Sequence, residues 1–349
     1  MAKKSLIGLD IGSKVVKAVE LTETGGIPQL TGFAQAEIAN PAQVNEVLSQ
    51  LVSRGGFRTN RVATAVSGRS VIVRYVNMPR MGDQELKNAI RYEAGKYIPF
   101  EVDEVVLDCQ RLEEQGANEG KEMRVVLVAV KKSLIDSHVG MLEQAGLVPH
   151  IIDVDSFALG NAFDLSQRSS KKPPENAVSA LVDMGAYKTN INIVRQKTTP
   201  SGRVLESCFT REVYLAGNDF TDAIQKKMNL DTSAAEGLKR QPNGQADDIK
   251  EIVSSALDDL CHEIHLSFDF FENQFDMEVQ HVLLCGGSSR VPGVEEAFVR
   301  TFADRIALKA WNPTEGLEVK LDRASPDQLK NAGPQLAIGL GLASRIEEK

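Results

Sequence analysis

An acid, a glycine, a serine and two lysines share one short turn near the N-terminus, and these residue types could bind a phosphate group. The stretch Asp-Ile-Gly-Ser-Lys-Val-Val-Lys runs from Asp10 to Lys17, with Gly12, Ser13 and Lys14 inside it. Glycine lets the backbone approach a ligand, serine supplies a hydroxyl donor, and successive amides in a turn bind anions. The carboxylate could hold the hydrated cation of a nucleotide. Many hairpins carry Asp and Gly for turn chemistry only, so this motif alone is weak.

The same pattern occurs a second time in the middle of the chain. An apolar run at 177–182 leads into Asp183-Met-Gly185, and a short polar turn containing Thr189 leads into a second apolar run at 191–194. Each of the two stretches therefore predicts a pair of strands joined by an acidic turn that contains glycine. Two such turns that face each other would place two carboxylates around one phosphate chain.

A third glycine-rich turn completes the set. Gly286, Gly287 and Ser288 follow the apolar residues 282–285 and precede a helical pattern that begins near Gly293. Two acidic hairpins and a glycine turn that opens a helix predict a site for a triphosphate, with a metal ion between the hairpins. The three turns in this order are far more specific than any one of them.

The periodicity around these turns predicts an α/β protein of two lobes. Strand patterns rich in Val, Ile and Leu alternate with helical patterns such as 42–53, which begins after the N-cap residue Asn40 and ends before Gly55. The 349 residues exceed what one core usually supports, so we expect lobe I over 1–176 and lobe II over 177–349. Each lobe should contain a mixed sheet covered by helices.

Two insertions and a terminal helix complete the predicted organisation. A compact α+β module at about 77–147, which includes a helix at 83–97, should interrupt lobe I. A helical block at about 216–277 should interrupt lobe II. The helix at 335–346 is rich in glycine and alanine, and we expect it to pack closely on a helix near Leu159.

The composition limits the classes of protein and partner. With 42% apolar and 25% charged residues the chain is typical of a soluble protein, and a formal charge of −8 argues against nucleic acid or an anionic membrane as partner. No apolar run approaches the roughly 20 residues that span a bilayer, and the N-terminus offers no secretory signal. Cys261, His262 and His265 share one predicted helix, but the two histidines are three apart rather than four, which disfavours a metal site. We therefore expect a cytoplasmic protein with reduced thiols and no direct membrane insertion.

The three turns resemble those of the actin-like ATPase superfamily, which includes actin, heat-shock chaperones, sugar kinases, MreB and FtsA. DIGSKVVK resembles the phosphate-one loop of that superfamily, DMGAYKT its phosphate-two loop and CGGSSRVPG its adenosine loop. Within the superfamily the chain most resembles the PilM family, FtsA-like cytoplasmic proteins of type IV pilus assembly. The stretches IGLDIGSKVVKAVEL, MPRMGDQELKNAIRYEAGKYIPF and DVDSFALGNAF carry this resemblance, which spans nearly the whole chain.

The resemblance implies an actin-like fold that binds ATP and Mg²⁺. It also implies that the helix at 335–346 crosses back to lobe I. Asp10 and Asp183 would flank the metal ion, mostly through water. Glu236 would bind the ribose and Lys239 would flank the adenine, although in most helices such a pair is only a surface ion pair. The residues that the resemblance implies in nucleotide binding are Asp10, Gly12, Ser13, Lys14, Lys17, Asp183, Gly185, Thr189, Gly217, Glu236, Lys239, Gly286, Gly287 and Ser288.

The same resemblance implies slow catalysis at most. Asp155 stands where FtsA and MreB carry a glutamate, and it would orient the hydrolytic water with a side chain that is one methylene shorter. Asn190 replaces the histidine of actin and cannot act as a base. We therefore expect nucleotide binding as the main property, with weak ATPase activity at most.

The inserted module resembles subdomain 1C of FtsA and PilM, which implies a partner-binding role. In PilM-like proteins a groove between subdomains 1A and 1C holds the cytoplasmic N-terminal tail of the inner-membrane protein PilN. Arg91 and Tyr97, in the predicted helix 83–97, are the candidates for contacts with that tail. The alternative is that Leu86, Ile90 and Tyr97 form the core of the module, and for Ile90 this alternative is favoured. The resemblance also implies recruitment to the inner membrane, contacts with the motor ATPases, and self-association into a ring or filament.

Two other functions share the same motifs. An FtsA-like cell-division protein would have the same fold, but this chain ends Glu-Glu-Lys without a membrane-targeting tail. A small-molecule kinase would need an acid aimed at an acceptor hydroxyl, and no second polar constellation supplies one. The scaffold of a type IV pilus machine is therefore the preferred interpretation.

Overall fold

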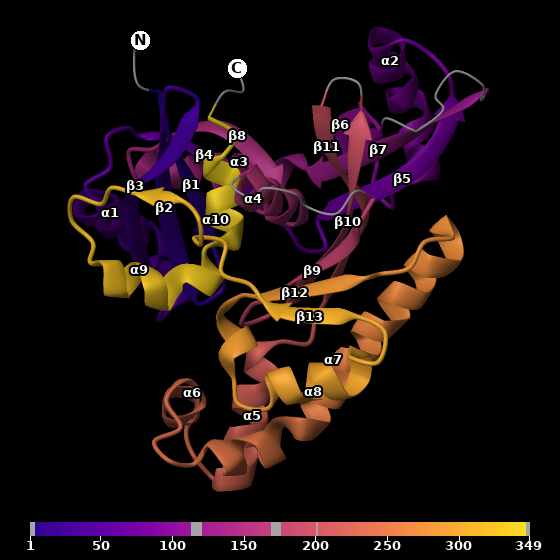
Figure 1. The fold of residues 1–349 in the computed structure, drawn as a ribbon. Coiled ribbons are helices and arrows are strands. Elements are labelled where there is room, and N and C mark those ends of the chain that lie inside the picture. The colour runs from indigo at the N-terminus through magenta and orange to yellow at the C-terminus, as the bar shows by residue number, and fades with distance from the viewer. Residues whose placement is uncertain (1–3, 113–120, 169–175, 200–201, 347–349) are drawn as a thin grey trace. The chain divides into compact units, whose positions relative to one another are not determined.

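The computed structural model describes residues 4–112, 121–168, 176–199 and 202–346 (Figure 1). The chain divides into two compact units. The first consists of Met1–Ala65 together with Leu147–Lys349, and the second is the intervening segment Val66–Gly146. Each unit has its own sheet structure and its own hydrophobic core.

The first unit contains a six-stranded mixed sheet in the order β14-β3-β2-β1-β4-β8. β1 pairs antiparallel with β2 and parallel with β4. Residues 6–10 of β1 are all buried, as expected for a central strand that is covered on both faces. The strands are β1 Lys4–Ile11, β2 Val15–Thr24, β3 Ile27–Glu37, β4 Arg61–Val66, β8 Val148–Val154 and β14 Glu318–Val319.

A five-stranded sheet in the same unit repeats this arrangement, in the order β11-β10-β9-β12-β13. β9 pairs antiparallel with β10 and parallel with β12, just as β1 does with β2 and β4. The strands are β9 Val178–Met184, β10 Thr189–Thr199, β11 Gly202–Val213, β12 His281–Cys285 and β13 Ala307–Ala310. The repeated hairpins β1-β2 and β9-β10 are the two acidic hairpins that the sequence predicts.

Two helices, α4 (Asp155–Arg168) and α10 (Ala337–Ala343), join the two sheets through one core cluster. An added Cβ at Gly341 would lie 1.7 Å from the carbonyl oxygen of Ala158, and one at Gly8 would lie 1.8 Å from that of Gly339. Only glycine permits backbones to approach this closely. The close packing predicted for the small-residue helix is therefore confirmed, although α10 itself is shorter than 335–346.

The other helices of the first unit flank the two sheets. α1 contacts β2 and β3, while α7 contacts α5, α8 and β11 (Figure 1). The core around α7 is aromatic, because Phe220, Phe268, Phe271 and Phe298 are fully buried in it. The bounds are α1 Val44–Gly55, α5 Gly217–Met228, α6 Thr232–Arg240, α7 Ala246–Phe275, α8 Val294–Phe302 and α9 Pro326–Ala332.

The second unit is a three-stranded antiparallel sheet in the order β5-β7-β6, with helices α2 and α3. β5 belongs to this unit because it pairs with β7 along its whole length. Leu86 and Ile90 of α2 are buried in a core shared with the sheet. The bounds are β5 Val71–Pro79, α2 Asp83–Glu93, β6 Val105–Arg111, β7 Glu122–Lys131 and α3 Lys132–Gln144.

Some elements differ from the sequence-based expectations. The helix expected at 83–97 ends at Glu93, and Ala94–Lys96 continue it as a 3-10 turn. β14 and α9 were not expected at all, although Ser325 and Gln328 form a capping box and Pro326 is the first residue of α9. Within the part of the chain that the structure describes, no helix combines the length and the apolar character needed to cross a membrane.

Candidate nucleotide-binding site

The two acidic hairpins present their carboxylates in equivalent positions. Asp10 lies opposite Lys17 across β1-β2, and Asp183 lies opposite Asn190 across β9-β10. Lys17 Nζ is 2.7 Å from Asp10 Oδ2, and Asn190 Nδ2 donates to Asp183 Oδ2 at 3.4 Å. The first hairpin therefore neutralises its aspartate with a lysine, whereas the second offers only an amide.

The charged groups of both hairpins interact with one another. Burial raises the pKa of Asp183 to about 6, Lys17 opposes this shift, and the carboxylates of Asp10 and Asp155 reinforce it. Burial works against the charged form of Lys17, but the carboxylates of Asp10, Asp183 and Asp155 together raise its pKa above the usual value. The carboxylates of Asp10, Asp155 and Asp183 thus all act on Lys17, and added positive charge would stabilise their ionised forms.

The donor set at this point fits a hydrated magnesium ion. Asn190 is 3% exposed, and its Oδ1 atom is buried without a hydrogen-bond partner beside Asp183. A buried acceptor of this kind is costly unless a water or an ion reaches it. No group of three or more His, Cys, Asp or Glu side chains among the described residues forms a metal cage. The carboxylates of Asp10 and Asp183 and the amide oxygen of Asn190 are oxygen groups of the kind that a hydrated magnesium ion uses as ligands.

Asp155 is held by residues that the sequence did not single out. It is the first residue of α4, and its Oδ2 atom lies 3.0 Å from Lys188 Nζ, in the turn of the second hairpin. Lys188 also lies 2.6 Å from Glu212 Oε1, and the three side chains are 13–25% exposed. The position of Lys188 inside the turn motif was the only sequence signal for this role. Its ammonium neutralises part of the charge of Asp155.

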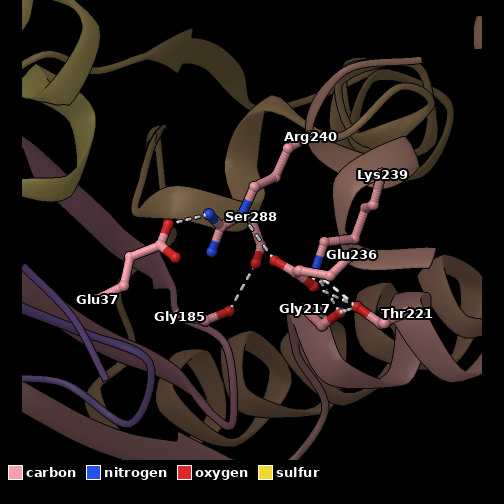
Figure 2. Close-up of polar contacts among 8 residues, drawn as sticks. All are labelled: Glu37, Gly185, Gly217, Thr221, Glu236, Lys239, Arg240 and Ser288. Carbon is pink, nitrogen blue, oxygen red and sulfur yellow. Dashed lines mark hydrogen bonds and ion pairs between the residues drawn. The ribbon is translucent and has the colours of Figure 1, made fainter. Parts of the chain in front are cut away.

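The carbonyl group of Gly185 in the second hairpin contacts both the start of α5 and the glycine turn at 286–288 (Figure 2). The oxygen of Gly185 accepts hydrogen bonds from Ser288 Oγ at 2.7 Å and from the amide of Gly217 at 3.1 Å. An added Cβ at Gly217 would lie 2.2 Å from Ser288 Oγ, so the contact requires glycine there. Gly286 adopts a φ of 89°, and a Cβ there would lie 2.6 Å from Asp183 Oδ1.

A buried polar cluster lies next to this junction. Lys239, which is 5% exposed, donates to the carbonyl of Gly217 and to Thr221 Oγ1, both at 2.8 Å. Glu236 Oε2 accepts from both Lys239 and Thr221 at 2.6 Å. Burial lowers the pKa of Lys239, while its ion pair with Glu236 opposes the shift. The two residues do form an i,i+3 ion pair, but it is anchored to the backbone rather than being an ordinary surface pair.

The remaining predicted residues are placed less tightly. Ser13 and Lys14 are exposed in the first turn, and the amide of Gly12 donates to the carbonyl of Val15. Thr189 is buried with its hydroxyl donating to the carbonyl of Leu215, so this hydroxyl serves the backbone. A Cβ on Gly287 would meet the side chain of Gln335 at 3.5 Å.

The two residues predicted to bind a partner lie in the second unit and differ in exposure. Arg91 is exposed, whereas Tyr97 packs partly buried against the core of that unit. Leu86 and Ile90 are core residues, whereas Lys87, Arg91 and Tyr92 of α2 are exposed, Tyr92 at 87%.

The duplicated hairpins and the two sheets define an actin-like fold. A solved structure of an MreB protein of Spiroplasma citri bound to ADP covers 97% of this chain and 94% of its own, with 12% identity and a TM-score of 0.52. An archaeal actin homologue covers 99% of both chains, with 11% identity and a TM-score of 0.50. At these identities the likeness concerns the fold alone.

The family follows from a closer relationship. Residues 8–347 match the family described as type IV pilus assembly protein PilM. A solved structure described as a PilM-PilN type IV pilus biogenesis complex is 31% identical, covers 99% of both chains and has a TM-score of 0.82. The chain therefore belongs to the PilM family of type IV pilus assembly proteins, which confirms the family suggested by the sequence motifs.

Proposed function

We propose that this chain binds Mg-ATP at the two acidic hairpins and acts as a nucleotide-binding scaffold in type IV pilus assembly. The observation that carries the proposal is the convergence of Asp10, Lys17, Asp155 and Asp183, with the orphaned Asn190 Oδ1 among them. The solved MreB structure with the same fold is described as bound to ADP, which supports nucleotide binding by this fold.

The chain's own residues would divide the work of binding. Asp10 and Asp183 would hold the hydrated ion, and Lys17 would compensate the phosphate charge as a point charge. Lys14 and the first turn would supply further donors to the phosphates. Glu236 would accept a hydrogen bond from a hydroxyl of the ribose. This bond would replace one of its hydrogen bonds with Lys239 and Thr221. A bound Mg²⁺ ion would supply charge neutralisation at the phosphates.

Turnover should be slow. Asp155 is the candidate for orienting the hydrolytic water, but its ion pair with Lys188 weakens it as an acceptor, and Asn190 cannot take up a proton. A steady-state phosphate-release assay tests this expectation. A rate near the median enzyme value of about 10 per second would contradict the scaffold function and favour an enzyme of the same fold.

The partner that we propose is the cytoplasmic tail of PilN, because a relative at 31% identity is described in a complex with PilN. Binding of this tail would recruit the protein from the cytoplasm to the inner membrane, where motor ATPases and further copies of the chain are additional candidates. Arg91 is exposed on α2 and would meet an acidic group of the tail, whereas Tyr97 would contribute only part of its ring.

Calorimetry with a PilN tail peptide tests the partner proposal. Arg91→Glu should weaken binding by at least about fivefold, since truncating or reversing a charge that meets a partner costs about 1 kcal/mol or more. Arg74→Glu, on β5 of the same unit, is the matched control, because Arg74 is likewise exposed. Equal affinities of the two variants would place the tail elsewhere.

Melting curves test the nucleotide proposal. Mg-ATP should raise the melting temperature of the wild type, because a ligand that binds only the folded state stabilises it by mass action. Asp10→Ala should abolish the response. An equal response of the wild type and the variant would refute the site.

A further inference from the structure

Glu37 and Arg240 form an ion pair between two segments of the first unit that lie far apart in the sequence. Glu37 is the last residue of β3, and Arg240 is the last residue of α6. Arg240 Nη1 lies 2.5 Å from Glu37 Oε1 (Figure 2). The amide of the next residue, Ile38, donates to the carbonyl of Lys14 at 2.7 Å. The ion pair therefore connects α6 to the neighbourhood of the first acidic hairpin.

The guanidinium of Arg240 also reaches the polar cluster at the site. Its Nε atom donates to Glu236 Oε1 at 2.8 Å, while Glu236 Oε2 is occupied by Lys239 and Thr221 (Figure 2). One arginine thus joins the carboxylate of Glu236 to a carboxylate of the first sheet. A ligand that hydrogen-bonds to Glu236 Oε1 would compete with Arg240 for this atom.

Two lysines, one in the first hairpin and one in α6, repel each other near the Glu37–Arg240 ion pair. Lys14 of the first hairpin lies close enough to Lys239 of α6 for its charge to disfavour the ammonium form of Lys239, in addition to burial. An anionic phosphate chain near these lysines would remove their repulsion. The attraction between Glu37 and Arg240 opposes that repulsion whether or not a ligand is present.

We propose that the Glu37–Arg240 pair is a latch that holds α6 against the end of β3, next to the turn of the first hairpin, and slows the release of bound nucleotide. The inference rests on the proposed nucleotide-binding function and adds a kinetic role for two residues outside the predicted site. The two side chains are 70% and 44% exposed, so the latch belongs to the weak class of surface ion pairs. Its loss should accelerate nucleotide dissociation by about two- to fivefold, and salt should screen the effect.

The first experiment follows the dissociation of radiolabelled ATP with Mg²⁺ during a chase with unlabelled ATP. Glu37→Gln is the cleanest variant, because Arg240 keeps its hydrogen bond to Glu236 in it. Arg240→Gln and the double variant complete a cycle, and Arg168→Gln is the control because it removes another exposed ion pair, with Asp164. We expect faster release from Glu37→Gln at low ionic strength, no additional acceleration by the second substitution beyond that of Arg240→Gln, and convergence with the wild type at about 0.5 M salt.

The second experiment measures hydrogen exchange of the α6 amides without nucleotide. Glu37→Gln should speed exchange at 232–240 relative to the wild type and Arg168→Gln, because the latch would no longer restrain this helix. Unchanged exchange in α6, or unchanged ATP release from Glu37→Gln at low salt, would overturn the latch. Failure of the wild type itself to retain labelled ATP would instead refute the nucleotide function, and the exchange result would still decide whether the pair restrains α6.

Discussion

The burial of Asp183 predicts that a charge needed for function lowers the stability of the nucleotide-free protein. Burial raises the pKa of this carboxyl to about 6, against 3.8 for the ordinary group. At 1.36 kcal/mol for each pKa unit, keeping Asp183 ionised costs about 3 kcal/mol at pH 8. Asp183→Asn preserves the shape of the side chain and removes the charge. The free energy of unfolding of the variant should therefore be about 3 kcal/mol higher than that of the wild type at pH 8.

The difference in stability between the wild type and Asp183→Asn should depend on pH. Between pH 3.8 and pH 6 the folded wild type keeps a proton that the unfolded chain has lost. The stability of the wild type therefore falls as pH rises through this window, and the penalty is complete above it. The variant has no such penalty, so its advantage should grow from about 1.6 kcal/mol at pH 5 to about 3 kcal/mol at pH 8.

Urea unfolding of the nucleotide-free protein in the presence of a chelator provides the assay. Fluorescence of Trp311, the single tryptophan and 5% exposed, reports on the core between the two sheets. Asp164→Asn, which alters an exposed ion pair on α4, is the control and should change stability by less than about 0.5 kcal/mol. A variant less stable than the wild type at pH 8, or an advantage that does not change between pH 5 and pH 8, would show that the charge of Asp183 does not destabilise the folded protein.

Three further predictions follow from packing, burial and ligand binding. Gly341→Ala should destabilise the protein by about 3 kcal/mol or more in urea unfolding, because its Cβ would overlap the carbonyl of Ala158, whereas Gly237→Ala in α6, where a Cβ meets nothing within 4 Å, should be neutral or stabilise by about 1 kcal/mol. Burial lowers the pKa of His138 below 6.5. The neutral imidazole should therefore favour the folded state above pH 6.5, and this contribution to stability should be lost as pH falls through the folded pKa. His138→Asn should flatten this part of a pH–stability curve. Saturating Mg-ATP at about 100 times Kd should stabilise the wild type by about 2.7 kcal/mol and leave Asp183→Asn unchanged in the same urea assay.

The elements that carry the site could be predicted because their signals are local. Each acidic hairpin combines two apolar runs with an Asp-x-Gly turn, and the structure builds both as equivalent pairs, Asp10 opposite Lys17 and Asp183 opposite Asn190. The small residues of α10 likewise predicted close packing, and at Gly341 the backbone of α10 does approach the carbonyl of Ala158 closely. A local pattern of this kind fixes the backbone and the register of nearby side chains.

The long-range ion pairs could not be predicted, because the sequence around a charged residue does not indicate which distant residue it will pair with. Lys188 pairs with Asp155 and Glu212, and Arg240 pairs with Glu37, across large separations in sequence. α9 is a different case, since its capping box and N-terminal proline were available signals in a short helix without a long apolar periodicity. The tertiary pairs, by contrast, depend on the packing of both sheets.

Calorimetric titration of ATP, with and without Mg²⁺, measures directly whether the two acidic hairpins bind the nucleotide. We expect saturable binding of Mg-ATP to the wild type at a stoichiometry of about one, much weaker binding without Mg²⁺, and loss of binding in Asp10→Asn. Asp164→Asn should bind as the wild type does. Binding of equal strength to the wild type and to Asp10→Asn, or no binding to the wild type, would contradict the assignment of the two acidic hairpins as the nucleotide site.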